Sequence, residues 1–185
     1  MEYVQARSSH QERVIVDGKP YHPFLSADPS NPDSIGHVVK QIFQLVDDNG
    51  NDDDKSLSLT VTPVLGGITN KLFLVEATAA TLTAFPKTLV RIFGGHDTGI
   101  DRDKETALYA SLARQEIAGL SSNAYFGRFA NGRLEEWKGD TMRPVQTHEM
   151  SRKIIYRGVA RQLAQLHYKF QVPSVENYED ITPTL

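Results

Sequence analysis

The sequence contains no cysteine. This absence excludes a disulfide framework, a thiolate metal site and a cysteine nucleophile, and it fits a reducing compartment. No apolar run is long enough to span a bilayer, and the first 13 residues are polar and lack the apolar core of a signal peptide. We therefore expect a cytoplasmic protein that is not inserted into a membrane.

An excess of charge of one sign is also missing. The 20 Lys and Arg residues face 23 Asp and Glu, which gives a formal net charge of −3. Such a balance predicts no broad electrostatic surface for nucleic acid or for an anionic membrane, and we expect neither partner. The 185 residues equal one ordinary domain or two small lobes, enough to bury a sizeable core.

The apolar pattern predicts an α+β layout of three strands, a helix, two strands and a final helix. Proline-rich residues 1–31 are expected to form an extended arm and loop. The expected strands cover residues 56–62, 72–75, 88–93, 124–129 and 133–137, the last two joined by Asn131-Gly132, a strong hairpin signal. The expected helices begin at Ser34, at Arg102 after the N-cap Asp101 and before Gly119, and after the N-cap Thr147.

Residues 65–71 read Leu-Gly-Gly-Ile-Thr-Asn-Lys and lie between the first two expected strands. They are not a Walker A loop, because Lys71 is followed by Leu72 and by a strand instead of a helix. A double glycine between strands is often only a tight hairpin. Alternatively, its backbone N–H groups approach phosphate oxygens closely, and Thr69 and Asn70 add side-chain donors.

Two charged residues favour the phosphate interpretation. Arg91 lies in the third apolar strand, and Glu105 lies in the first turn of the next helix. Each alone is most simply a surface or salt-bridged residue. In this order, a glycine turn, a strand cation and a helix glutamate reproduce the logic of a kinase N-lobe, where the glutamate holds a phosphate-binding cation.

Four motifs follow one another along the chain, and a final helix covers 159–167. The motifs are Gly66-Gly67-Ile68-Thr69-Asn70-Lys71-Leu72, Leu89-Val90-Arg91-Ile92-Phe93-Gly94, Asp101-Arg102-Asp103-Lys104-Glu105 and the segment 127–136. In order and spacing they resemble the ethanolamine kinase and choline kinase family, and the likeness covers roughly residues 34–170.

The resemblance implies a protein-kinase-like N-lobe with a five-stranded antiparallel sheet and one packed helix, followed by the first helix of a truncated C-lobe. The expected boundaries are an N-terminal arm at 1–33, the N-lobe at 34–137, an inter-lobe linker at 138–145 and the start of the C-lobe at 146–185.

The resemblance also implies ATP and Mg²⁺ as cofactors. Gly66, Gly67, Ile68, Thr69, Asn70 and Lys71 would cover the phosphates. Arg91 would contact them, held by Glu105. The backbone of the segment from Glu136 to Met142 would face the adenine ring, although Trp137 is equally well explained as a core residue at a strand end.

The family's catalytic loop, which supplies the base and a metal-binding asparagine, has no counterpart in this sequence. We therefore assign no catalytic or metal residue, place the magnesium ligands in a missing C-lobe, and expect negligible turnover from this chain alone. In the complete architecture, ATP would phosphorylate ethanolamine to phosphoethanolamine for phosphatidylethanolamine synthesis by the CDP-ethanolamine route.

Three alternatives stay open. Ile68-Thr69-Asn70 and Ile100-Asp101-Arg102 favour ethanolamine over choline, but choline kinase is the neighbouring possibility. A noncatalytic fragment or isoform would instead bind a full-length partner or dimerise through an apolar patch on Trp137 and the last helix. An aminoglycoside kinase relative shares the N-lobe logic, and the same two motifs argue against it.

Overall fold

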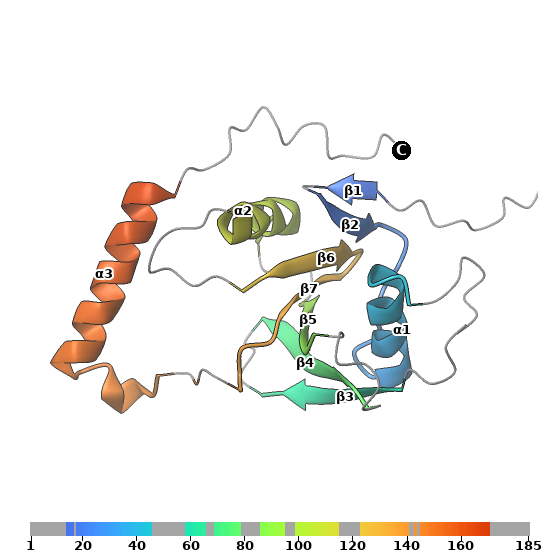
Figure 1. Ribbon diagram of the computed structural model, residues 1–185, viewed down its shortest axis with the longest axis horizontal. Coiled ribbons are helices and arrows are strands. Elements are labelled where there is room, and N and C mark those ends of the chain that lie inside the picture. Colours follow the sequence, from blue (N-terminus) through green and yellow to red (C-terminus); the bar gives the residue numbers. More distant parts are fainter. Residues whose placement is uncertain are drawn as a thin grey trace, which may run out of the picture.

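A seven-stranded sheet forms the centre of the computed structural model (Figure 1). The strand order is β1-β2-β6-β7-β5-β4-β3, and every neighbouring pair is antiparallel except β2 and β6. The structure describes residues 14–16, 18–45, 58–65, 69–78, 86–94, 99–114, 123–140, 143 and 145–170.

The elements have the following bounds. The strands are β1 Val14–Val16, β2 Lys19–His22, β3 Leu59–Val64, β4 Asn70–Ala77, β5 Thr88–Phe93, β6 Tyr125–Phe129 and β7 Gly132–Glu136. The helices are α1 Pro32–Ile42, α2 Arg102–Arg114, the 3₁₀ turn η2 Thr147–Glu149 and α3 Lys153–Lys169. The expected α+β class, the β3-β4-β5 meander and the β6-β7 hairpin are confirmed.

The N-terminal segment differs from the expected arm because it belongs to the sheet. It adds β1 and β2, so the sheet has seven strands instead of five. The side chain of Asn131 explains the attachment: its Oδ1 accepts a hydrogen bond from the Ala27 N–H at 3.0 Å, and its Nδ2 donates one to the Ala27 carbonyl at 2.8 Å. Leu25 and Ala27 are consequently buried in the core.

α1 begins at Pro32, two residues before the expected Ser34. Asn31 is the N-cap, because its side chain accepts hydrogen bonds from the backbone of Asp33 and Ser34. Pro32 fits the first helical position, where no N–H partner is needed. The apolar stripe then packs on one face of the sheet, in a buried cluster that includes Ile35, Val38, Val39, Ile42, Val75, Val90 and Leu134.

α2 covers the opposite face of the sheet. Leu134 and Arg133 are adjacent on β7 and therefore point to opposite faces. Leu134 joins the core under α1, whereas Arg133 contacts Tyr109 of α2. Asp101 is confirmed as the N-cap, since its Oδ1 accepts hydrogen bonds from two backbone N–H groups of the first turn. The expected continuation to residue 118 and the stop at Gly119 lie outside the described residues.

The expected N-cap role of Thr147 is wrong. Thr147 opens the separate turn η2, and α3 starts six residues later at Lys153. The Glu149 carboxylate stabilises this turn, because it accepts hydrogen bonds from the Gln146 backbone at 2.9 Å and from both terminal nitrogens of Arg143 at 2.7 Å. No side chain of α3 is buried.

Candidate functional site

The start of β4 and the end of β5 meet at one end of the sheet. Asn70 lies opposite Phe93 in register, and its Oδ1 accepts a long hydrogen bond from the Gly94 N–H at 3.4 Å. A Cβ at Gly94 would lie only 1.9 Å from the Thr69 carbonyl oxygen. The close approach therefore requires glycine at position 94, and it fixes the outgoing side of the glycine turn.

The turn itself is only partly described. Gly66, Gly67 and Ile68 lie outside the described residues, so their predicted phosphate role stays a prediction. On the incoming side Leu65 is 96% exposed. This exposure leaves Leu65 available to a ligand or to another part of the protein.

Arg91 lies in the middle of β5, between Leu72 and Arg133 in the sheet register. Its Nε donates to Oε1 of Glu135 at 2.6 Å, and its Nη2 donates to Oε2 at 3.2 Å. This bidentate pair fixes the plane of the guanidinium. The side chain is 23% exposed, and its Nη1 has no hydrogen-bond partner among the described residues. The N–H groups of Nη1 thus stay available to an anionic ligand.

The predicted Arg91–Glu105 pair is wrong, because the partner of Arg91 is Glu135. Glu105 accepts a hydrogen bond from Arg102 Nη1 at 2.7 Å, and its other carboxylate oxygen lies 3.6 Å from Arg133 Nη1. Arg133 therefore connects Glu105 with Glu135, because its Nε donates to Glu135 Oε1 at 2.7 Å. Alternating charges connect Arg91 to α2 indirectly.

Burial and the two arginines together decide the protonation of Glu135. The residue is 1% exposed, and burial by itself would raise its pKa. The hydrogen bond from Arg91 and the charge of Arg133 outweigh burial, so the pKa of Glu135 lies below its usual value. Burial likewise opposes the charge on Arg91, yet Glu135 raises the pKa of Arg91. Both groups are therefore charged at neutral pH.

Two aromatic rings complete the environment of Arg133. Its guanidinium carbon lies 4.3 Å from the ring centroid of Tyr109 and 5.9 Å from that of Phe93, while Arg102 lies 5.0 Å from Phe93. Arg133 is 4% exposed, and its buried Nη1 has no hydrogen-bond partner in the described part of the chain. Contacts with the π-faces compensate part of this cost and hold α2 against the sheet.

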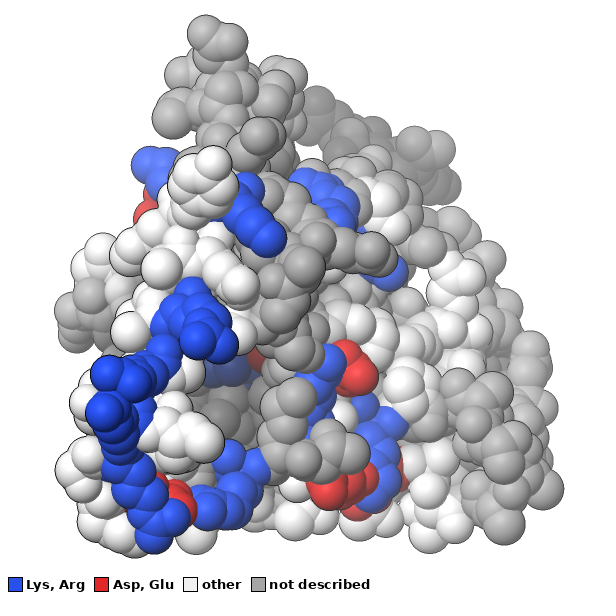
Figure 2. All heavy atoms as spheres, turned by 60° about the vertical axis from the view of Figure 1, so that its left-hand side comes forward, with Lys and Arg blue, Asp and Glu red and all other residues white. Residues whose placement is uncertain are grey.

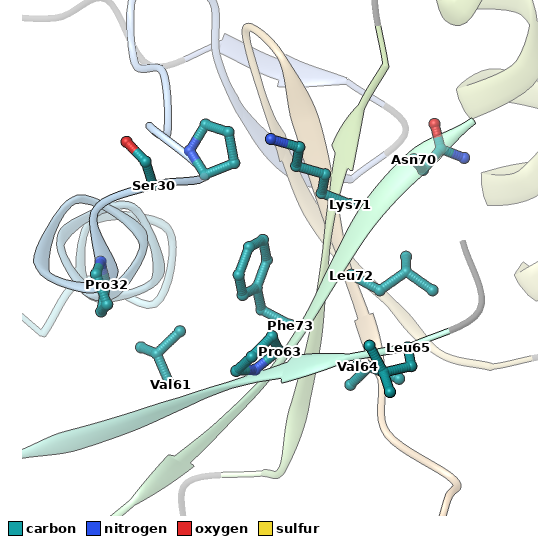
Figure 3. Close-up of a pocket in the computed structure, with 11 residues that line it drawn as sticks. Ser30, Pro32, Val61, Pro63, Val64, Leu65, Asn70, Lys71, Leu72 and Phe73 are labelled. Atoms are coloured by element: carbon teal, nitrogen blue, oxygen red, sulfur yellow. The ribbon is translucent and has the colours of Figure 1, made fainter. Parts of the chain in front are cut away.

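Lys71 and Arg91 do not share a face of the sheet. Leu72 is paired with Arg91, so the neighbouring Lys71 points to the α1 side. There it lines a cavity of about 440 Å³ with Pro29, Ser30, Pro32, Val61, Pro63, Val64, Leu65, Asn70, Leu72 and Phe73. Figure 3 shows the Lys71 side chain extending from β4 toward the segment before α1.

Glu136 and Trp137 lie at the other end of β5 from the glycine turn. Glu136 is opposite Thr88, accepts a hydrogen bond from the Ala124 N–H at 3.1 Å and pairs with Lys138 at 3.2 Å. Glu136 directly follows Glu135 on β7, so its side chain points to the opposite face of the sheet from the carboxylate that holds Arg91.

The indole of Trp137 folds back onto its own segment. Its Nε1 donates to Asp140 at 3.2 Å, and a Cβ at Gly139 would lie 2.1 Å from the ring. The Lys87 side chain forms an ion pair with Asp140 at 2.7 Å. The Lys87 backbone carbonyl accepts a hydrogen bond from the Trp137 backbone N–H at 3.1 Å. These contacts fasten the segment after β7 to the beginning of β5.

Sequence reasoning missed Glu135 and Arg133. A signal for them exists, because two charged residues two apart in a strand must share one face. Among the described residues, no group of three or more His, Cys, Asp or Glu side chains is placed to hold a metal ion. None of the helices in the described part of the chain combines the length and apolar character needed to cross a bilayer.

Comparison with known proteins gives a consistent result. The family model described as choline/ethanolamine kinase matches residues 61–184. Probable choline kinase 2 of Arabidopsis thaliana is 31% identical over 100 residues, which are 54% of this chain and 27% of that protein.

Two solved structures share the fold. A choline kinase from Cryptosporidium parvum matches with a TM-score of 0.54 and 21% identity, over 77% of this chain and 38% of that one. An ethanolamine kinase from Plasmodium vivax matches with a TM-score of 0.56 and 23% identity, over 85% and 39%. The chain thus spans between about a quarter and two fifths of the length of these relatives.

Proposed function

Because this chain belongs to the choline/ethanolamine kinase family, we propose that its sheet and α2 form the nucleotide-binding part of an ATP-dependent kinase. The substrate would be the hydroxyl group of a small amino alcohol. The observation that supports this best is Arg91, a partly exposed strand cation whose Nε and Nη2 are fixed by the buried Glu135 while Nη1 stays available.

Arg91 suits a nucleotide phosphate because its charge and orientation are both set in advance. Phosphoryl transfer depends on positioning and charge stabilisation more than on covalent chemistry by the protein. Nη1 of Arg91 would donate to a phosphate oxygen of ATP, while the turn at 66–71 would contribute backbone donors. Mg²⁺, when bound with ATP, would neutralise phosphate charge.

We also propose a division of the chain, which the resemblance to the family supports. The nucleotide lobe would span 34–137, extended by β1 and β2; residues 138–145 would link it to a second lobe that starts within 146–185. The catalytic base and the metal ligands would belong to the part of the relatives that this chain does not span. We therefore expect nucleotide binding without measurable turnover from the chain alone.

The acceptor we propose is ethanolamine, with choline as the alternative. Support for ethanolamine comes from the motifs at 68–70 and 100–102, whereas the matched proteins include kinases named for each alcohol. A longer protein that contains this chain would distinguish the two in direct competition, with equal concentrations of both alcohols and a single preparation of enzyme.

Binding of ATP to the purified chain tests the proposal. Titration calorimetry should detect binding, and Arg91→Ala should weaken it at least tenfold, because one charge-assisted phosphate contact is worth about 1.5–3 kcal/mol. Arg161→Ala, which removes an exposed arginine from α3, is the matched control and should change affinity less than twofold. Equal affinities of the Arg91 variant and the wild type would refute the site.

A second candidate is a noncatalytic chain that associates through α3. Its apolar stripe is unburied: Val159 and Leu163 are both more than a third exposed. Sedimentation velocity should then show self-association, or complex formation with a longer kinase of the family, that Leu163→Glu abolishes. A monomeric wild type that also ignores the longer kinase would exclude this candidate.

A further inference from the structure

α3 carries a basic face that has no ionic partner among the residues that the structure describes. The helix contains four Lys and Arg residues and no Asp or Glu. Lys153, Arg157 and Arg161 follow at intervals of four and so lie along one side. No ion pair or hydrogen bond joins their side chains to another described residue. Figure 2 shows Lys and Arg side chains gathered along the side of the molecule that carries α3.

Two large side chains lie within this basic face and are almost fully exposed to solvent. Ile154 is 80% exposed and Tyr168 is 88% exposed. Ile154 precedes Arg157 by three residues, and Tyr168 follows Arg161 by seven, so both share the side of the arginines. Single exposed apolar residues are normal on a protein surface, but beside cations they suit contact with lipid, where apolar side chains enter the boundary between headgroups and acyl chains.

The basic face is separate from the apolar stripe of the same helix. Ile155 and Leu166 are half-buried, and with Val159 and Leu163 they form the opposite side. Protein that covers the stripe alone would leave the basic face exposed.

We propose that the face formed by Lys153, Ile154, Arg157, Arg161 and Tyr168 binds a phospholipid bilayer that carries anionic headgroups. The cations pair with headgroup phosphates and carboxylates, and Ile154 and Tyr168 enter the boundary between headgroups and acyl chains. Tyr168 has a ring that stacks on a base, but Ile154 has none and gains only from an apolar environment, so a lipid surface suits both side chains better than a single-stranded nucleic acid.

The overall charge of −3 does not oppose this contact. At physiological ionic strength, charges more than about 8 Å from the membrane contact are largely screened. The attraction to the membrane therefore depends on the local positive charge of α3. No described carboxylate pairs with Lys153, Arg157 or Arg161. The surface is independent of ATP binding, so the proposal survives a failure of the proposed nucleotide site.

Vesicle flotation with the purified chain tests the proposal. Vesicles of phosphatidylcholine with 30% phosphatidylserine should carry the chain upward, and pure phosphatidylcholine vesicles should not. Arg157→Glu should lower the partition coefficient at least fivefold, and Ile154→Gln should lower it several-fold. Lys19→Glu makes the same charge change at an exposed residue of β2 and should have less than a twofold effect. Circular dichroism verifies that each variant stays helical.

Three results would overturn it. If the chain floated equally well with neutral and anionic vesicles, binding would be due to the apolar stripe. If Lys19→Glu lowered the partition coefficient as much as Arg157→Glu, the effect would be due to net charge. Tighter binding to a 20-nucleotide RNA than to the anionic vesicles, unchanged by Ile154→Gln, would assign the face to nucleic acid.

Discussion

Arg91 of β5 is held by Glu135 of β7, with its Nε 2.6 Å from the Glu135 Oε1. The two residues belong to adjacent antiparallel strands, and Leu89 is the register partner of Glu135. Since Leu89 and Arg91 are two residues apart, all three side chains lie on the same face of the sheet. The phosphate-facing cation that we propose is thus positioned within the sheet, and the ion pairs of Arg133 with Glu135 and Glu105 connect it to α2.

Glu135→Gln should be far more damaging than Glu105→Gln. Removing the charge of Glu135 leaves Arg91 and Arg133 without their buried counter-ion, which should cost about 3 kcal/mol of unfolding free energy. Glu105 is about a third exposed and should cost about 1 kcal/mol or less. Urea denaturation measures both. Similar losses in the two variants would mean that α2, not β7, holds the cation.

The Glu135 interaction also predicts a pH dependence. Because the pKa of Glu135 is lowered in the folded protein from the usual 4.5, the unfolded chain takes up its proton first as pH falls. The stabilisation is complete above pH 4.5 and is lost as pH falls toward the folded pKa. The difference in unfolding free energy between wild type and Glu135→Gln should therefore be constant near neutral pH and shrink below pH 4.5. A constant difference down to pH 3 would contradict the pairing.

Gly94→Ala should displace the glycine turn. The new Cβ would meet the Thr69 carbonyl oxygen at 1.9 Å, so one backbone must move, at a cost of about 2 kcal/mol. Nucleotide affinity should fall as well, since the turn is the proposed phosphate cover. Gly36→Ala is the control: nothing lies within 4 Å of its Cβ in α1, and the change should stabilise the protein by up to about 1 kcal/mol. Thermal unfolding and calorimetry compare the two.

Tryptophan fluorescence reports on the segment after β7, because Trp137 is the single tryptophan of the sequence. Gly139→Ala would place a Cβ 2.1 Å from the indole and should drive the ring into solvent, with a red-shifted emission maximum. Gly158→Ala, where nothing lies within 4 Å of the new Cβ, should leave the emission unchanged. An unshifted spectrum for Gly139→Ala would show that the indole does not lie against this glycine.

Sequence patterns predicted strands β3 to β7, the cap of α2 and the hairpin turn, because each of these depends on interactions between residues close together in the chain. Alternation of apolar and polar residues located β3, a short apolar run located β5, and Asp101 was recognised as a cap because its side chain satisfies the nearby backbone. The Asn131-Gly132 turn gave the β6-β7 hairpin. The attachment of residues 14–28 could not be predicted, since it depends on Asn131, 104 residues away from Ala27. The expected N-cap of the last helix was wrong, because the pair of Arg143 and Glu149 stabilises the separate turn η2 before that helix.

The amino-acid sequence alone therefore determined the family, the α+β class and the identity of the strand cation, since these depend on motifs read along the chain. Only the tertiary structure decided which carboxylate holds Arg91, on which face Lys71 lies and that no described carboxylate pairs with the cations of α3. The reason is physical: strand register and helix docking set distances between residues far apart in sequence. A net charge or a motif order contains no information about such distances.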